Sequence, residues 1–146
     1  MPKTTTTKKE LIVDFKLHGI ELLEVCVTHP KQPDQDLKVA HFDINIEHRQ
    51  NPATNLLTAI ITIDLFNNQR VFKLGSITAS CTFEIANIHE FKDKKSTRFL
   101  FPDTFLITIN AITISTTRGI MFNQFKGTFL QNAILPIVDP RSYTKP

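Results

Sequence analysis

The sequence predicts a single domain built mainly from long strands, which belongs to the α+β class if one further segment forms a helix. Its 146 residues suffice for one compact domain, and 41% of them are hydrophobic, which excludes a disordered chain. Threonine occurs 18 times and isoleucine 17 times, and both are β-branched residues that favour pleated sheet. One segment departs from this pattern, because Phe101-Pro102-Asp103 is typical of a helix start and Lys126-Gly127 of a helix end.

The chain divides into an arm, one domain and a tail. We expect residues 1–10, rich in threonine and lysine, to form a flexible arm, residues 11–140 the domain, and residues 141–146 a short tail. The arm lacks the apolar stretch of a secretory signal, and no apolar run approaches the ~20 residues of a membrane-spanning helix. We therefore expect a cytoplasmic protein without membrane insertion, in which Cys26 and Cys81 are reduced core residues.

Four segments have the apolar pattern of strands, and they cover residues 15–28, 39–49, 56–66 and 71–88. In the first, strict alternation places Leu22 opposite Val25 and Val27. In the last, Val71 is expected on the same face as Ile77 and the apolar residues that follow it. A hairpin is expected between the last two segments, at 67–70. Strands of this length leave long edges, which must be covered or paired with another chain.

The segment between the two helix signals has an ambiguous pattern. Phe105–Thr117 is rich in isoleucine and threonine, which favours a strand. Apolar residues nevertheless recur there at helical spacing, as Phe105, Ile109 and Ile112 do. A helix gives the α+β domain, whereas a strand would give a non-enzymatic β-barrel that closes around a small molecule or lipid and carries it.

No motif indicates catalysis. The histidines and the two cysteines lack metal-ligand spacing, and no G-x-S-x-G, Walker A or G-x-G-x-x-G motif occurs. We therefore expect no enzyme activity, no cofactor and no metal. The net charge is +3, but the basic residues are scattered and form no stripe interleaved with aromatics, so we expect no nucleic-acid partner.

Several segments resemble, in the same order, the family of the bacterial export chaperone SecB. Phe15–Pro30, FKLHGIELLEVCVTHP, resembles the opening strand of that family, and Ile77–Ile88, ITASCTFEIANI, resembles a later strand. Phe99–Pro102, FLFP, resembles the entry to its main helix, and Lys126–Val138, KGTFLQNAILPIV, resembles the helix end and the segment after it. The matches span residues 15–139, so the sequence is similar to SecB-like proteins over most of its length.

The resemblance implies a fold, an activity and an assembly. The fold is a long-stranded, four-stranded antiparallel sheet followed by one long helix over Asp103–Lys126. The activity is that of an ATP-independent chaperone, or holdase, which binds unfolded polypeptides for preprotein translocation and protein transport or protects clients such as antitoxins. The assembly is a homotetramer formed as a dimer of dimers.

Departures from the family pattern bear on export. Acidic residues on the family's sheet contact the SecA export ATPase, and the matching positions here are Glu24, Thr28 and Ser76, of which only the first is an acid. Family members are usually acidic, whereas this chain is basic, and residues 141–146 stand where the family has its final helix. We therefore expect SecA coupling to be weak and protection of other clients to be the better match.

A holdase needs exposed apolar surface and reachable hydrogen-bonding groups, and a groove between sheet and helix supplies both. Eight of the 12 phenylalanines lie at or beyond residue 83, and any that the core does not hide would line such a groove. The alternative is that the same side chains are ordinary core. The expected groove residues are Phe42, Ile44, Ile46, Phe122, Phe125 and Phe129.

Overall fold

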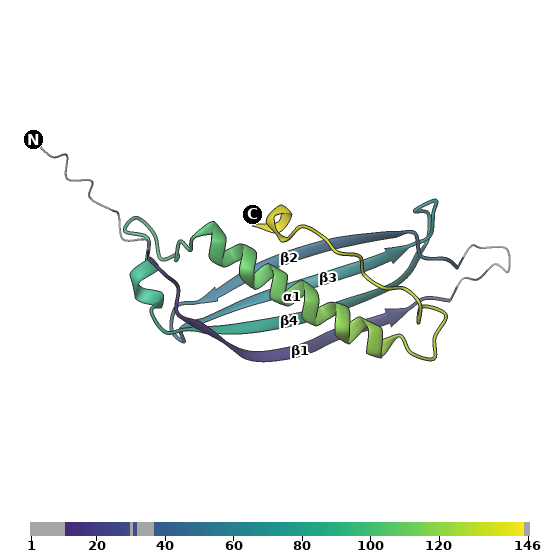
Figure 1. Ribbon diagram of the computed structural model, residues 1–146, viewed down its shortest axis with the longest axis horizontal. Coiled ribbons are helices and arrows are strands. Elements are labelled where there is room, and N and C mark those ends of the chain that lie inside the picture. The colour runs from purple at the N-terminus through teal and green to yellow at the C-terminus, as the bar shows by residue number, and fades with distance from the viewer. Residues whose placement is uncertain (1–10, 30, 32–36, 145–146) are drawn as a thin grey trace, which may run out of the picture.

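The computed structural model describes residues 11–29, 31 and 37–144 of the chain. Its elements are β1 (Phe15–Val27), β2 (His41–Asn51), β3 (Leu56–Phe66), β4 (Lys73–Ile85), the 3-10 helix η1 (Ile88–Phe91), the helix α1 (Asp103–Gln124) and the 3-10 helix η2 (Pro140–Tyr143) (Figure 1). The expected arm at residues 1–10 lies outside the described residues, as does the end of the expected tail at 145–146.

The four strands form one antiparallel sheet in the order β1-β4-β3-β2, so β1 and β2 are its edges. β2 and β3 pair without interruption over their full length of 11 residues each. The expected hairpin between β3 and β4 is present, with the Arg70 amide donating to the Asn67 carbonyl at 3.1 Å. The prediction of a long-stranded, four-stranded antiparallel sheet is therefore confirmed.

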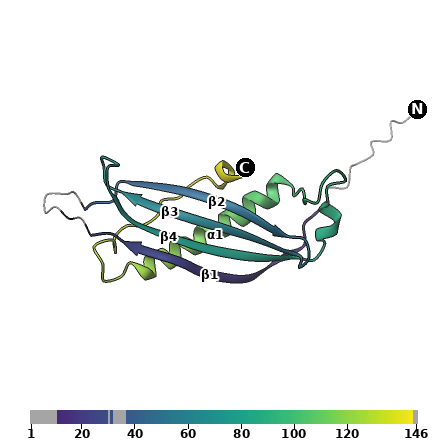
Figure 2. The same cartoon turned by 180° about the vertical axis from the view of Figure 1, so that it is seen from behind.

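α1 crosses one face of this sheet diagonally, and within the described chain the other face carries no helix (Figures 1 and 2). Every second residue of β3 from Leu57 to Leu65 is fully buried on the helix side, and β4 does the same from Ile77 to Ile85. Val71, expected on that same face, is 82% exposed instead, because it lies in the turn before β4 begins.

α1 occupies the segment whose pattern is ambiguous in the sequence. Thr113 and Thr117 lie fully buried on its sheet-facing side, and each hydroxyl donates to the carbonyl four residues earlier at 2.7 Å. Because this bond satisfies the hydroxyl inside the core, a buried threonine packs there much as a valine does. The helix over Asp103–Gln124 removes the strand on which the β-barrel carrier alternative depended.

The alternate side chains of β1 switch from one side of the sheet to the other along the strand. Its pairing with β4 shifts register between Leu17 and Gly19, and again between Leu22 and Glu24. An extra residue in a strand moves the side chains beyond it to the other face. Leu22 consequently pairs with a core residue of β4 and faces α1 together with Val25, so the opposite placement expected from strict alternation was wrong.

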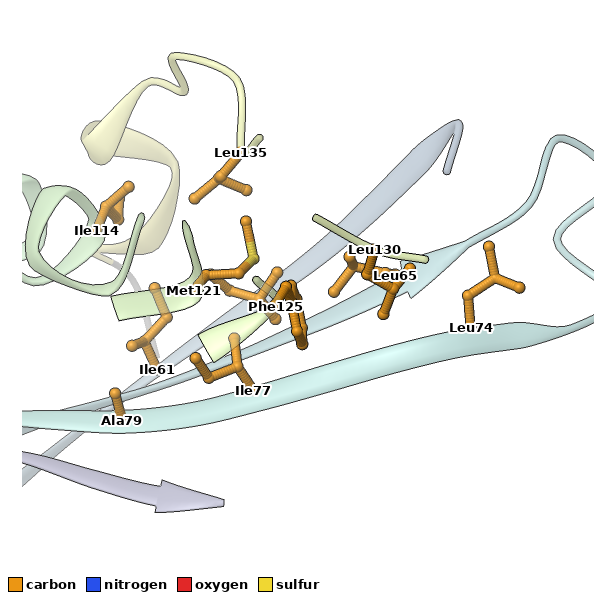
Figure 3. Close-up of a cluster of buried hydrophobic side chains, with 11 residues drawn as sticks. Ile61, Leu65, Leu74, Ile77, Ala79, Ile114, Met121, Phe125, Leu130 and Leu135 are labelled. Atoms are coloured by element: carbon orange, nitrogen blue, oxygen red, sulfur yellow. The ribbon is translucent and has the colours of Figure 1, made fainter. Parts of the chain in front are cut away.

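Beyond α1 the chain turns at Gly127, whose φ of 78° is left-handed, and returns beside the helix. This C-terminal segment, residues 128–144, runs on the β2 side of the same sheet face and ends in η2 against α1 (Figure 1). Its Leu130 and Leu135 are buried in the same cluster as Phe125 (Figure 3). The core between sheet and helix is therefore completed by a segment without regular secondary structure.

Contrary to the expectation from the sequence, α1 is long and apolar enough, by length and composition, to cross a membrane, a property that core helices of soluble proteins share. Its most apolar stretch is 39% buried inside the protein, chiefly against the sheet.

Candidate functional site

The diagonal course of α1 leaves two regions of the helix-side sheet face outside its cover (Figure 1). One lies over the start of β2, and the other over the middle of β1. We call them the β2 region and the β1 region. Both border an edge strand, so each combines apolar side chains with backbone groups that no neighbouring strand pairs within the described chain.

The β2 region contains three of the residues expected from the sequence. Phe42, Ile44 and Ile46 face α1, because each pairs with a buried residue of β3 that does so. All three are half-buried, and they pack on the main core cluster together with Val138 and Tyr143 of the C-terminal segment. The alternating face of β2 therefore forms a shallow apolar floor that the C-terminal segment covers.

The three phenylalanines around the helix end take different positions. Phe125 is fully buried in the core. Phe129 is half-buried on the same cluster, with the His29 ring 5.4 Å from its own. Phe122 is 49% exposed and lies outside the clusters, with the Lys126 Nζ 5.3 Å from its ring centre. The structure thus gathers the β2 residues with Phe125 and Phe129 on one cluster and leaves Phe122 apart.

A cavity of about 350 Å³ opens where the C-terminal segment passes the residues before β2. Its lining exposes both polar and apolar atoms and consists of Leu37, Lys38, Val39, Phe129, Asn132 and Ala133. Phe129 therefore both lines this cavity and packs on the core cluster that the β2 residues also contact.

The β1 region is an exposed apolar row that sequence analysis did not single out. Leu17, Ile20, Leu22 and Leu23 are between 38% and 51% exposed. Pairing with the inner residues of β4 places the first three on the helix side of the sheet. The two register shifts create this row, and Gly19 was the one signal of them in the sequence.

The positions expected to contact SecA come together on the opposite, helix-free face. Cys26 pairs with Ser76, and its Sγ lies 3.7 Å from the Thr28 Oγ1, so these side chains share one side. Glu24 lies two residues earlier on the same strand and pairs with Thr78. The structure thus places one carboxylate and two hydroxyls on the same face of the sheet near the end of β1.

Burial shifts the pKa of two of the described titratable groups. Burial raises the pKa of the Cys81 thiol and of the Tyr143 phenol, which keeps both protonated near neutral pH. Cys26 and Cys81 are both free thiols. Among the residues that the structure describes, no three His, Cys, Asp or Glu side chains gather closely enough to hold a metal ion.

No family model matches the sequence, and no curated protein matches it. Solved structures do match the fold. The SecB-like chaperone Rv1957 of Mycobacterium tuberculosis, in complex with a ChAD peptide from the Rv1956 HigA1 antitoxin, aligns with a TM-score of 0.59 and 15% identity over 85% of this chain and 89% of its own. A protein of unknown function from Streptococcus agalactiae aligns with a TM-score of 0.41 and 6% identity over 80% of this chain and 90% of its own. The first of these two alignments shows that this chain has the SecB-like α+β fold.

Proposed function

We propose that the protein is a non-enzymatic chaperone that binds unfolded polypeptides without ATP. The observation that carries the proposal is the β2 region, where Phe42, Ile44 and Ile46 form a half-buried apolar row on an edge strand. An unfolded chain offers apolar side chains and unpaired backbone groups, and such a surface accepts both with little demand for shape.

The fold supports this proposal. The similar chaperone of Mycobacterium tuberculosis was solved with a peptide bound, which makes an extended polypeptide the first ligand to test here. The free thiols of Cys26 and Cys81 accord with a reducing compartment, and the proposal places the chaperone in the cytoplasm.

An aggregation assay tests the proposal. A protein unfolded in denaturant is diluted into buffer, and light scattering is followed with increasing amounts of the chaperone and no nucleotide. We expect scattering to be suppressed near a one-to-one ratio of assembled chaperone to client. Unchanged scattering at a large molar excess of the folded chaperone would refute the proposal.

We further propose that the β1 region pairs with a second copy of the chain, within a homotetramer arranged as a dimer of dimers. The exposed row on β1 adjoins a strand edge of 13 residues that no other strand of the described residues pairs. Apolar side chains and unpaired backbone groups of this kind are usually covered by a partner. Ala111, Ser115 and Gly119 recur every four residues on the outer part of α1, and small side chains there let a second helix approach closely.

Sedimentation equilibrium at micromolar concentration tests the assembly. We expect Ile20→Lys to dissociate the oligomer, because Ile20 is 51% exposed in one chain and would be buried between two. Val71→Lys is the matched control, since Val71 is 82% exposed in a turn away from β1, and should leave the mass unchanged. A wild-type protein that is monomeric throughout would contradict the assembly without touching the chaperone assay.

We propose that coupling to SecA is weak and that protection of clients such as antitoxins is the main use. At the sheet position where the family carries acids, Glu24 is accompanied by the uncharged Thr28 and Ser76. Charge contacts of this kind raise association rates and set docking register. We expect Thr28→Asp to strengthen SecA binding in titration calorimetry, while tight binding by the wild type would contradict the proposal.

A further inference from the structure

Residues 134–140 of the C-terminal segment lie in the β2 region as a peptide that is extended as far as Asp139 and enters η2 at Pro140. Leu135 is buried to 1% exposure and lies near Ile114 and Met121 (Figure 3). Ile134 and Ile137, in contrast, are 58% and 96% exposed to solvent. One apolar side chain is thus inserted while its neighbours stay outside. An extended polypeptide bound on an apolar floor inserts its side chains in the same way.

Side chains hold the main chain of this peptide to α1, and the Asp139 carbonyl also accepts a local backbone hydrogen bond from the Ser142 amide at 3.2 Å. Arg118 donates through Nε to the Leu135 carbonyl at 2.8 Å and through Nη2 to the Pro136 carbonyl at 2.9 Å. The Asn110 Nδ2 donates to the Pro140 carbonyl at 3.4 Å. Within the described chain, residues 134–138 make no hydrogen bond from backbone to backbone. The peptide is therefore docked on the fold without belonging to its sheet.

Arg118 is suited to bind a peptide of any sequence. Its guanidinium has no carboxylate partner among the described residues, and its planar set of donors meets two successive carbonyl oxygens. Every peptide carries such carbonyls, so this contact selects for an extended main chain and leaves the side chains free to vary.

We infer that residues 134–140 are an internal occupant of the client groove, and that an unfolded client displaces them and takes over Arg118. The inference rests on the proposed function, because it assigns the β2 region to clients. Its ligand class is an extended peptide with an apolar side chain at the place of Leu135. Displacing this segment breaks no hydrogen bonds of the sheet, so an unfolded client can compete with it for the groove.

The test uses the full chain and a labelled peptide that copies residues 133–141, with binding followed by fluorescence anisotropy. We expect Leu135→Ser to bind this peptide about tenfold more tightly than the wild type, since a groove that is free only a tenth of the time weakens apparent affinity by that factor. Ile137→Ser is the matched control on the same segment and should bind as the wild type does, because Ile137 is 96% exposed.

A second pair of variants distinguishes the contribution of the planar guanidinium geometry of Arg118 from that of its positive charge. In the Leu135→Ser background, Arg118→Met should abolish the gain, and Arg118→Lys should restore only part of it, because one ammonium group cannot match two carbonyls as the planar fork does. If Leu135→Ser fails to fold, Val138→Ser loosens the same segment at a half-buried position and carries the test instead.

The outcomes distinguish this inference from the proposed function. A folded Leu135→Ser protein that binds the peptide no more tightly than the wild type would overturn the internal occupant. If the peptide binds more tightly as expected but no variant suppresses aggregation of an unfolded protein, the groove stands and the chaperone proposal fails.

Discussion

The His48 ring on β2 donates from Nε2 to the Oδ1 of Asn110 on α1 at 2.7 Å, which joins the edge strand to the helix. Asn110 is completely buried, and its amide also donates to the Pro140 carbonyl at 3.4 Å. One side chain thus connects sheet, helix and C-terminal segment. A buried amide is compatible with a stable core when, as here, its oxygen and its NH2 group both have hydrogen-bond partners.

Asn110→Ala should destabilise the fold by about 1–3 kcal/mol, because the half-buried His48 N–H and the Pro140 carbonyl both lose their partner. The measurement is the urea midpoint of unfolding. Asn123→Ala, at an exposed position of the same helix, is the control and should change stability little. Equal effects of the two changes would show that the connection contributes nothing.

The sheet was predictable from sequence because its alternation is strong, as in Phe42, Ile44 and Ile46. The helix was not predictable from local pattern alone. Thr113 and Thr117 looked like residues of a strand, yet tertiary packing buries them, and their hydroxyls bond within the helix. Residue propensity left the choice between helix and strand open for this segment, and the resemblance to SecB-like proteins predicted the helix.

The candidate site was predictable only in part. A pattern with a period of two residues cannot reveal a bulge. The placement of the Leu22 side chain on the α1 side of the sheet, and the exposed row on β1, were therefore not predictable from the sequence. The docking of Leu135 was not predictable for another reason. A proline-flanked segment without periodicity carries no local signal of what it covers, and Arg118 meets it only through the fold.

Gly75→Ala should destabilise the fold by about 1–3 kcal/mol, the usual cost of overpacking. A Cβ at Gly75 would lie 2.6 Å from the Leu130 Cδ1 and 2.9 Å from the backbone oxygen of Cys26, and the latter has little freedom to move. Gly19→Ala in β1 is the matched control, since a Cβ there meets nothing within 4 Å. Thermal unfolding compares the two, and a loss of stability confined to Gly19→Ala would contradict the packing.

Cys81 should make the fold less stable at alkaline pH. Burial raises the pKa of its thiol in the folded state, opposed in part by hydrogen bonds with Thr113 and Thr116. The unfolded thiol ionises near about pH 8.5, so the unfolded chain loses the proton first as pH rises. Below that pH the contribution is fully present, and above it the free energy of unfolding falls by at most about 1.4 kcal/mol per pH unit until the folded thiol also ionises.

Urea unfolding from about pH 7 to about pH 10 measures this slope, with Cys81→Ala as the comparison. Burial also raises the pKa of Tyr143, so both proteins share any contribution from its phenol. The difference between their slopes therefore belongs to Cys81. Parallel curves would mean that the thiol ionises equally easily in both states.

Alanine at three phenylalanines should separate groove from core. Phe125→Ala should cost about 3–5 kcal/mol of stability, because the ring is fully buried. Phe122→Ala should change the melting temperature little, since the ring is 49% exposed and lies outside the core clusters. Phe42→Ala, at a half-buried position of the β2 region, should cost less stability than Phe125→Ala but weaken the binding of unfolded clients most.

Client affinity, measured by anisotropy at a temperature where all three variants are folded, decides between these roles. If Phe42 belongs to the groove, its loss weakens binding while Phe122→Ala binds as the wild type does. The opposite result, with affinity lost at Phe122 alone, would move the client surface to the exposed end of α1 and away from β2. Phe125→Ala adds the remaining comparison, because a folded variant with normal affinity makes that ring a support of the core beneath the groove and not a part of its surface.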